Sequence, residues 1–212
     1  MNTSEAIIIG LVQGLTEFLP ISSSGHLVII QSLLNIDLPG NLIEVSAHFG
    51  TLLSIIMIYK KDIYDLIISF KSPKTKNYIF LVILATIPSV FFVLIAKPFI
   101  LSLFESSRSV SLALIFTGII LFISNYGSYV KNKLNTSKGL IIGLFQALAI
   151  LPGISRSGMT ISIALLLGIK SREAAKFSFM LAIPAIVGAT VLTLLETDFN
   201  EAKDLIMPLI TA

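Results

Sequence analysis

The chain of 212 residues contains no cysteine and no tryptophan, and only 13% of its residues are charged. The lack of cysteine excludes disulfides and thiolate metal sites. The scarcity of charge argues against a soluble domain, in which about 25% of residues are charged. Because 55% of the residues are hydrophobic, the composition predicts an integral membrane protein.

Basic residues are also scarce where two other classes of protein would need them. No Lys or Arg precedes the first apolar run, which carries Glu5 instead, so a cleavable signal peptide is not expected. The net charge is only +3, and most lysines lie between apolar runs, which argues against nucleic acid as a partner.

Four apolar runs approach the length of about 20 residues that a membrane-spanning helix needs. These predicted spans are residues 43–59, 77–96, 109–128 and 176–195. A fifth run begins near residue 205 and ends with the chain at Ala212. The fold class predicted from these runs is all-α.

Two other apolar regions, residues 4–34 and 139–169, are interrupted by proline, glycine and serine. Each region is too short for two spans and too broken for one. Non-helical backbone is tolerated at membrane depth only where it is buried in protein or lines a cavity. We therefore predict two re-entrant helical hairpins whose tips lie inside the membrane.

Basic residues cluster in three of the segments between apolar runs, and cytoplasmic loops are enriched in Lys and Arg. The clusters are Lys60, Lys61, Lys71, Lys74 and Lys76; Lys131, Lys133 and Lys138; and Lys170, Arg172 and Lys176. This pattern places both flanks of the first hairpin outside and both flanks of the second inside. The second hairpin is then inverted relative to the first, an arrangement that places a site near the midplane and favours opening to the outside.

We thus expect a polytopic membrane protein with a single domain over residues 1–212 and an inverted-topology repeat. Repeat one covers about residues 1–138, and repeat two covers about residues 139–212. By this symmetry repeat two is truncated by about 50 residues, counting about 20 residues per span plus loops.

A short internal duplication supports the repeat. Residues 10–25 and 143–158 align without a gap, 133 positions apart, and eight of the sixteen positions are identical. Both copies place hydroxyls and a glycine in apolar sequence. We predict that the two copies face each other and form one phosphate-handling site.

Ionisable residues within these apolar regions mark the candidate site, because a charge inside a membrane segment is expensive and indicates function. They are Glu17, His26 and Arg156. A helix beginning near Ser23 would offer free backbone N–H groups to an anion, and the planar fork of arginine can bind two phosphate oxygens. The simpler interpretation of the serines and glycines is close helix packing. We assign a structural or interfacial role to His48.

The stretch from Gly14 to His26 and the stretch from Pro152 to Thr160 read GLTEFLPISSSGH and PGISRSGMT. They resemble the two signature motifs of the undecaprenyl-diphosphate phosphatase family, the bacitracin-resistance type. The resemblance extends from the N-terminus to about residue 212. Family members have Glu or Gln at the position of Gln13 and continue through further spans beyond the end of this chain.

The resemblance implies hydrolysis of undecaprenyl diphosphate to undecaprenyl phosphate plus inorganic phosphate, which recycles the lipid carrier for peptidoglycan synthesis. It also implies a multi-pass protein of the bacterial inner membrane with roles in cell wall biogenesis and bacitracin resistance. The expected catalytic residues are Glu17, Ser23, His26 and Arg156. The expected phosphate-binding residues are Ser22, Ser24, Ser155, Ser157 and Thr160.

Phosphoryl transfer depends mainly on positioning and charge neutralisation. Arg156 would stabilise the transferred group, and His26 would act as general acid or base. A divalent cation, Mg²⁺ with Ca²⁺ and Mn²⁺ as alternatives, would bind Glu17 with Gln13 as a neutral ligand. The expected nucleophile is Ser23, with Ser22 and water as open alternatives.

Two other functions fit parts of this pattern. Inverted repeats with re-entrant hairpins are also a transporter layout, so a secondary transporter or flippase of lipid phosphates is the alternative, and a non-catalytic scaffold is the third reading. A histidine and a candidate nucleophile favour the enzyme. The expected partners are a polyprenyl diphosphate lipid and membrane lipid, without nucleic acid, and a homodimer is an option.

Overall fold

The computed structural model describes residues 3–36, 42–127 and 132–196, and within these ranges all regular structure is helical. The helices are α1 (Thr3–Thr16), α2 (Ser23–Leu34), α3 (Leu42–Ile58), α4 (Lys60–Ile68), α5 (Pro73–Phe104), α6 (Ser107–Ser124), α7 (Thr136–Leu148), α8 (Arg156–Leu166) and α9 (Ser171–Glu196). The predicted all-α class is confirmed.

The long apolar runs form long helices. In the described part of the chain, α5, α6 and residues Ser171–Thr193 of α9 are long and apolar enough to cross a membrane. The predicted span at residues 43–59 forms α3, whose 17 residues make it shorter than these three helices. The fifth predicted run lies outside the described residues. Lys60–Ile68, which we expected to be loop, forms α4, because its apolar residues recur at helical spacing.

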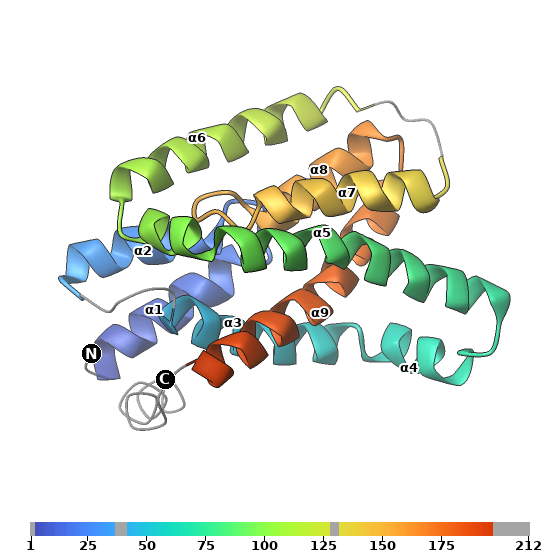
Figure 1. Cartoon of the computed structure of the whole chain (residues 1–212), viewed down its shortest axis with the longest axis horizontal. Coiled ribbons are helices and arrows are strands. Elements are labelled where there is room, and N and C mark those ends of the chain that lie inside the picture. The colour runs from blue at the N-terminus through green and yellow to red at the C-terminus, as the bar shows by residue number, and fades with distance from the viewer. Residues whose placement is uncertain (1–2, 37–41, 128–131, 197–212) are drawn as a thin grey trace.

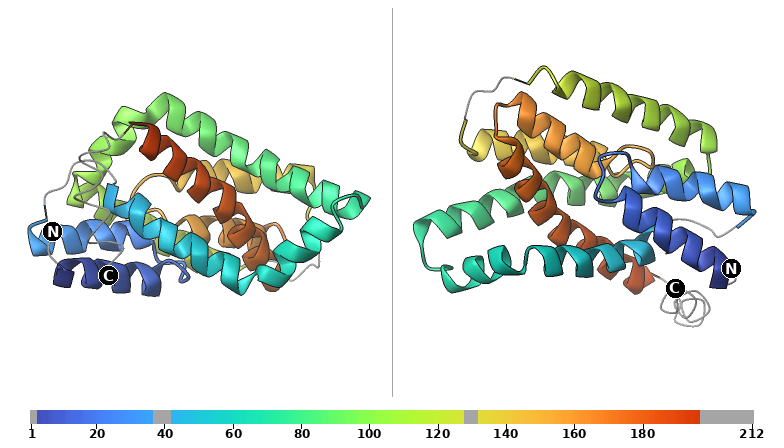
Figure 2. Two further views of the ribbon diagram at one scale, coloured as in Figure 1. Left: turned by 90° about the horizontal axis from the view of Figure 1, so that it is seen from below. Right: turned by 180° about the vertical axis from the view of Figure 1, so that it is seen from behind.

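The two interrupted regions each form two helices joined by a turn, as the sequence predicted. α1, α2, α7 and α8 have 11 to 14 residues each. At 1.5 Å per residue they are about 16–21 Å long, shorter than the hydrocarbon core of about 30 Å. The pair α1–α2 opens at one end of the molecule and the pair α7–α8 at the other, with their turns in the middle (Figures 1 and 2).

Each turn ends in a serine that caps the next helix, and the two serines are equivalent in the duplication. Ser22 Oγ accepts the backbone N–H of Gly25 at 3.3 Å, and Ser155 Oγ accepts that of Gly158 at 3.0 Å. Such caps satisfy backbone donors that the first helical turn leaves unpaired. The shared break in the sequence therefore produces the same local structure twice, with a helix N-terminus at each turn.

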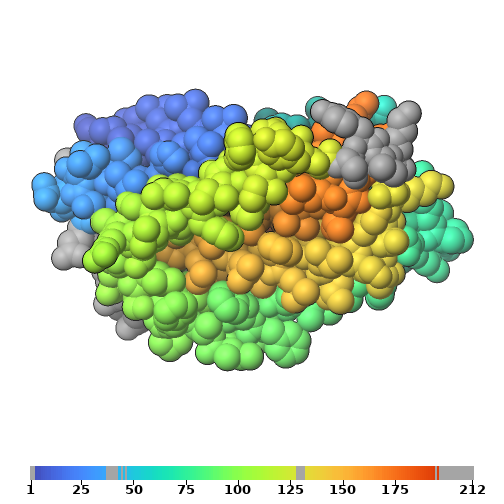
Figure 3. Space-filling view, turned by 90° about the horizontal axis from the view of Figure 1, so that it is seen from above, coloured from blue at the N-terminus to red at the C-terminus, as the bar shows by residue number. Residues whose placement is uncertain are grey.

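α6 holds the two pairs together. It packs against both α2 and α8, and Figure 3 shows it running along them on one face of the molecule. The buried hydroxyl of Thr117 donates to the carbonyl of Gly153 at 2.9 Å and accepts the N–H of Ser155 at 3.1 Å. Gly153 has φ of 91°, and a Cβ there would lie 2.4 Å from the carbonyl oxygen of Val110. The second turn is therefore fixed directly against α6.

One buried apolar cluster joins α5, α7, α8 and α9, a second joins α3 to α9, and a third joins α3 to α1 and α2. α7 approaches α5 closely, because a Cβ on Gly143 would lie 2.4 Å from the carbonyl oxygen of Ala85. Large apolar side chains on the outer faces stay exposed, such as Ile95 on α5 (80%) and Phe122 on α6 (64%). This distribution is expected for helices surrounded by lipid.

Candidate active site

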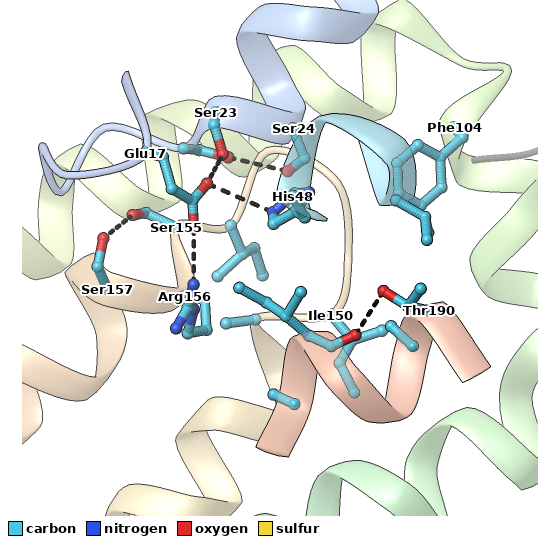
Figure 4. A pocket seen from close by; sticks show the side chains of 17 residues that line it. Glu17, Ser23, Ser24, His48, Phe104, Ile150, Ser155, Arg156, Ser157 and Thr190 are labelled. Carbon is cyan, nitrogen blue, oxygen red and sulfur yellow. Dashed lines mark hydrogen bonds and ion pairs between the residues drawn. The ribbon is translucent and has the colours of Figure 1, made fainter. Parts of the chain in front are cut away.

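A cavity of about 170 Å³ lies where the two turns meet. Its polar wall combines residues of the two turns, of the starts of α2 and α8, and of α3: Glu17, Ser22, Ser23, Ser24, His48, Ser155, Arg156 and Ser157. Its remaining wall is mainly apolar: Val45, Phe104, Ala149, Ile150, Ile154, Ala185, Ile186, Ala189 and Thr190. The cavity thus offers a polar end and an apolar end to one ligand (Figure 4).

The Glu17 carboxylate is the centre of the polar wall and is only 6% exposed. Its Oε1 accepts a hydrogen bond from Arg156 Nη2 at 2.6 Å. Its Oε2 accepts from Ser23 Oγ and from Gln13 Nε2, the latter at 3.2 Å. His48 Nε2 lies 3.3 Å from the same oxygen. The two sequence copies therefore meet in one ion pair, between Glu17 of the first and Arg156 of the second (Figure 4).

Local structure explains these positions. Glu17 follows Gln13 by one helical turn, and its N–H still bonds to the Gln13 carbonyl at 2.9 Å. Ser23 and Arg156 are the first residues of α2 and α8, so each side chain stands beside backbone N–H groups that the first helical turn leaves free. Two positively polarised helix ends thus approach the same cavity, an arrangement suited to an anion.

The remaining serines of the cavity form short chains of hydroxyls. The Oγ atoms of Ser22 and Ser24 are 3.3 Å apart, and those of Ser155 and Ser157 are 3.4 Å apart. Ser157 Oγ also lies 3.5 Å from the carbonyl oxygen of Leu19, so the second turn touches the first. Of the predicted hydroxyls, Ser23 is the one that donates to the Glu17 carboxylate.

The family model for bacitracin resistance protein BacA matches residues 6–212. The chain belongs to this family. It is 41% identical to an undecaprenyl-diphosphatase of Carboxydothermus hydrogenoformans, over 99% of this chain and 81% of the relative. A relative of the same name from Korarchaeum cryptofilum is 38% identical, over 95% of this chain and 80% of that protein. Another from Syntrophotalea carbinolica is 40% identical, over 92% and 78%.

Three predicted site residues of this BacA family member, Gln13, His26 and Thr160, do not line the cavity. His26 Nδ1 lies 2.7 Å from the carbonyl oxygen of Ser22, which is four residues earlier in the sequence. Thr160 is buried one turn into α8, on the face that packs against α9, and its hydroxyl pairs with Ser178 Oγ at 2.6 Å. A catalytic role for His26 and a phosphate-binding role for Thr160 therefore stay predictions of the sequence.

Two further residues at the site were not predicted from the sequence, and both lie on α3. His48 contacts Glu17, and Thr51 Oγ1 accepts Gln13 Nε2 at 3.0 Å. The rule that an ionisable residue in an apolar run indicates function could have identified His48. Thr51 has no such signal, because a threonine in a membrane helix usually only aids packing.

A divalent cation held by Glu17 and Gln13 stays a prediction of the sequence. Gln13 Oε1 is buried without a hydrogen-bond partner in the described part of the chain, and it belongs to a side chain already bonded to Glu17. Among the described residues, no three His, Cys, Asp or Glu side chains gather in one place. Mg²⁺ commonly takes one or two carboxylates together with substrate phosphates and water, so the single carboxylate of Glu17 would be enough for this predicted cation.

Proposed function

We propose that this chain hydrolyses undecaprenyl diphosphate to undecaprenyl phosphate and inorganic phosphate, and so recycles the lipid carrier for cell-wall synthesis. The observation that carries this conclusion is the Arg156–Glu17 ion pair at 2.6 Å, with Ser23 Oγ donating to the same carboxylate. A guanidinium, a serine hydroxyl and a carboxylate thus share one cavity, which supports their proposed roles in phosphate binding, nucleophilic attack and proton acceptance. The names of the relatives and the membership in the BacA family support the same activity.

In the first step, Ser23 Oγ attacks the terminal phosphorus and passes its proton to the Glu17 carboxylate, to which it is already hydrogen-bonded. The bond from the terminal phosphorus to the bridging oxygen breaks, and undecaprenyl phosphate leaves. Water then hydrolyses the phosphoserine and releases inorganic phosphate. Direct attack by water is the alternative, and it would leave no phosphoserine.

Arg156 and the helix ends supply the positive charge for this reaction. Arg156 Nη1 is buried and has no hydrogen-bond partner among the described residues, so it is the guanidinium nitrogen available to a phosphate oxygen. The first N–H groups of α2 and α8 and the hydroxyls of Ser24 and Ser157 provide further donors around the phosphate. Most of the catalysis is thus expected from positioned charge, as in other phosphoryl transfers.

A divalent cation, Mg²⁺ with Ca²⁺ and Mn²⁺ as alternatives, would be held by Glu17 and by Gln13 Oε1. When bound, it would neutralise negative charge on the diphosphate. We expect chelation of divalent cations to reduce phosphate release and added Mg²⁺ to restore it.

The apolar wall of the cavity would receive the first isoprene units of the lipid. Phe104 from the end of α5, Ile150 from the second turn and Ala189 from α9 line this wall. Ile150 occupies the position in the second copy that Glu17 has in the first. The first copy of the duplicated sequence thus contributes a carboxylate to the polar wall, and the second copy contributes an apolar side chain to the apolar wall.

We infer that the protein is multi-pass, with α1–α2 and α7–α8 as re-entrant hairpins of an inverted repeat in the inner membrane. The short lengths of these helices and the opposite directions of the two pairs support this topology (Figure 1). The basic residues near both ends of α7–α8 support cytoplasmic flanks for this pair. The site would then open outward through the first hairpin.

Phosphate release from purified protein, with undecaprenyl diphosphate and Mg²⁺ in detergent, tests the proposed activity. We expect release by the wild type and at least a hundredfold loss in Ser23→Ala, as for removal of a nucleophile. The opposed hairpins also fit a flippase of lipid phosphates. Movement of the lipid across vesicle membranes without phosphate release would favour that function and overturn ours.

A further inference from the structure

His48 is the one cavity-lining ionisable residue for which the proposed mechanism has no role. It lies on α3, outside both copies of the duplicated sequence. Its Nε2 is 3.3 Å from Glu17 Oε2, and its side chain is 24% exposed, at the cavity wall. This placement distinguishes His48 from His26, whose Nδ1 contacts the carbonyl oxygen of Ser22.

The chemistry of the contact fixes the direction of the hydrogen bond. A carboxylate only accepts hydrogen bonds, so Nε2 must carry the proton when it approaches Oε2. The same oxygen also accepts Ser23 Oγ. A hydrogen bond from His48 to Oε2 would thus help to hold this oxygen where it faces Ser23 Oγ and can receive the serine proton.

A second contact from α3 acts on the same carboxylate. Thr51 lies three residues after His48, on the same side of the helix. Its hydroxyl accepts Gln13 Nε2 at 3.0 Å, and Gln13 Nε2 is also 3.2 Å from Glu17 Oε2. α3 thus supports Glu17 directly through His48 and indirectly through the Thr51–Gln13 contact. α3 packs against α1 and α9, so this support rests on the body of the molecule.

We propose that His48 is a positioning residue for the phosphatase reaction, whose Nε2–H holds the Glu17 carboxylate in the orientation that accepts the Ser23 proton. This inference rests on the proposed function. In this role the imidazole donates one fixed hydrogen bond and transfers no proton. Any side chain that reaches the same oxygen with an N–H group should replace it.

Two substitutions separate positioning from proton transfer. His48→Gln keeps an N–H donor but has no titrating group, whereas His48→Leu removes the donor. We expect His48→Leu to lower kcat by about ten- to a hundredfold, the effect of losing one hydrogen bond to a charged group, with KM nearly unchanged. We expect His48→Gln to retain kcat within about threefold, the spread typical of individual contacts, and to show the wild-type pH profile.

The matched control is Phe49→Leu on the next position of α3, whose side chain is exposed and does not line the cavity. Its kcat should equal that of the wild type. If His48→Leu does not fold, His48→Ala serves as the second variant without a donor. Wild-type kcat in the donor-free variant would overturn the proposal. Equal losses in His48→Gln and His48→Leu would also overturn it and would assign proton transfer to the imidazole.

Infrared spectroscopy of the Glu17 carboxylate tests the contact without using activity. The difference spectrum between the wild type and Glu17→Gln isolates the carboxylate stretch of this residue. We expect that band to shift in His48→Leu and to stay in place in His48→Gln. An unchanged band in both variants would refute the contact. Absence of phosphate release by the wild type would instead refute the proposed function and leave this spectroscopic result to decide the role of His48 at Glu17.

Discussion

The Arg156 guanidinium has two separate tasks at the residue scale. Its Nη2 pairs with Glu17 at 2.6 Å, and its buried Nη1, which has no hydrogen-bond partner among the described residues, would bind a phosphate oxygen in the proposed reaction. A lysine would keep the positive charge, but its single ammonium group lacks the two fixed nitrogens with which arginine can contact Glu17 and a phosphate oxygen at the same time. This difference makes Arg156→Lys a test of geometry and not of charge.

We expect Arg156→Lys to lower kcat/KM by about a hundredfold or more, as for the loss of a preorganised donor that stabilises a transition state. Steady-state phosphate release measures the effect. Arg172→Lys, at an exposed position at the start of α9, is the matched control and should behave as the wild type. Comparable rates for Arg156→Lys and the wild type would show that charge alone is sufficient.

Thr117 is the residue through which α6 fixes the second turn. In Thr117→Val, the carbonyl of Gly153 and the N–H of Ser155 would lose this buried partner. We expect the free energy of unfolding to fall by about 2 kcal/mol and phosphate release to fall with it, because Arg156 directly follows this turn. Thermal unfolding in detergent measures the first effect.

The control for this prediction is Thr86→Val on α5. Among the residues that the structure describes, the Thr86 hydroxyl bonds only to the Val82 carbonyl of its own helix, at 2.8 Å, so its loss should change stability little. Equal melting temperatures for the Thr117 and Thr86 variants would show that the second turn does not depend on α6.

At the scale of elements, the interruptions in the apolar runs were the informative signal. Proline, glycine and serine in residues 4–34 and 139–169 predicted two broken regions, and each forms a helix, a turn and a helix. α4 was not predicted, because the lysines around it suggested a loop. Its nine residues are also too few to show a clear helical period. Local composition therefore identified where helices break more reliably than where a short surface helix forms.

The proposed re-entrant hairpins predict which helix ends share a membrane face. The chain has no cysteine, so single Ser→Cys variants can be labelled without background. We expect Ser4→Cys and Ser32→Cys, at the open end of α1–α2, to react with an impermeant thiol reagent from the outside. Ser137→Cys and Ser171→Cys, beside the open end of α7–α8, should react only after the cytoplasmic side is exposed.

Each result of this labelling has a clear meaning for the topology. Labelling of Ser4→Cys and Ser32→Cys from opposite sides would show that α1 and α2 together cross the membrane once. Labelling of all four positions from one side would show that the second hairpin is not inverted.

At the scale of the whole molecule, the duplication predicted that two segments 133 positions apart would share a site, and Glu17 and Arg156 do meet there. The supporting contacts could not be predicted in this way. Thr51 and Thr117 touch the site only because α3 and α6 pack beside it. Contacts between residues far apart in the sequence cannot be predicted from the residue pattern around either partner.

The central claim is that both turns build one site within a single chain. The most direct test is cross-linking of Leu19→Cys with Ser157→Cys, because Ser157 Oγ lies 3.5 Å from the Leu19 carbonyl oxygen and the chain has no other thiol. We predict that a short bifunctional thiol reagent consumes both cysteines and adds one linker mass to a monomer. Two singly modified cysteines, or linkage only between two chains, would contradict the shared site.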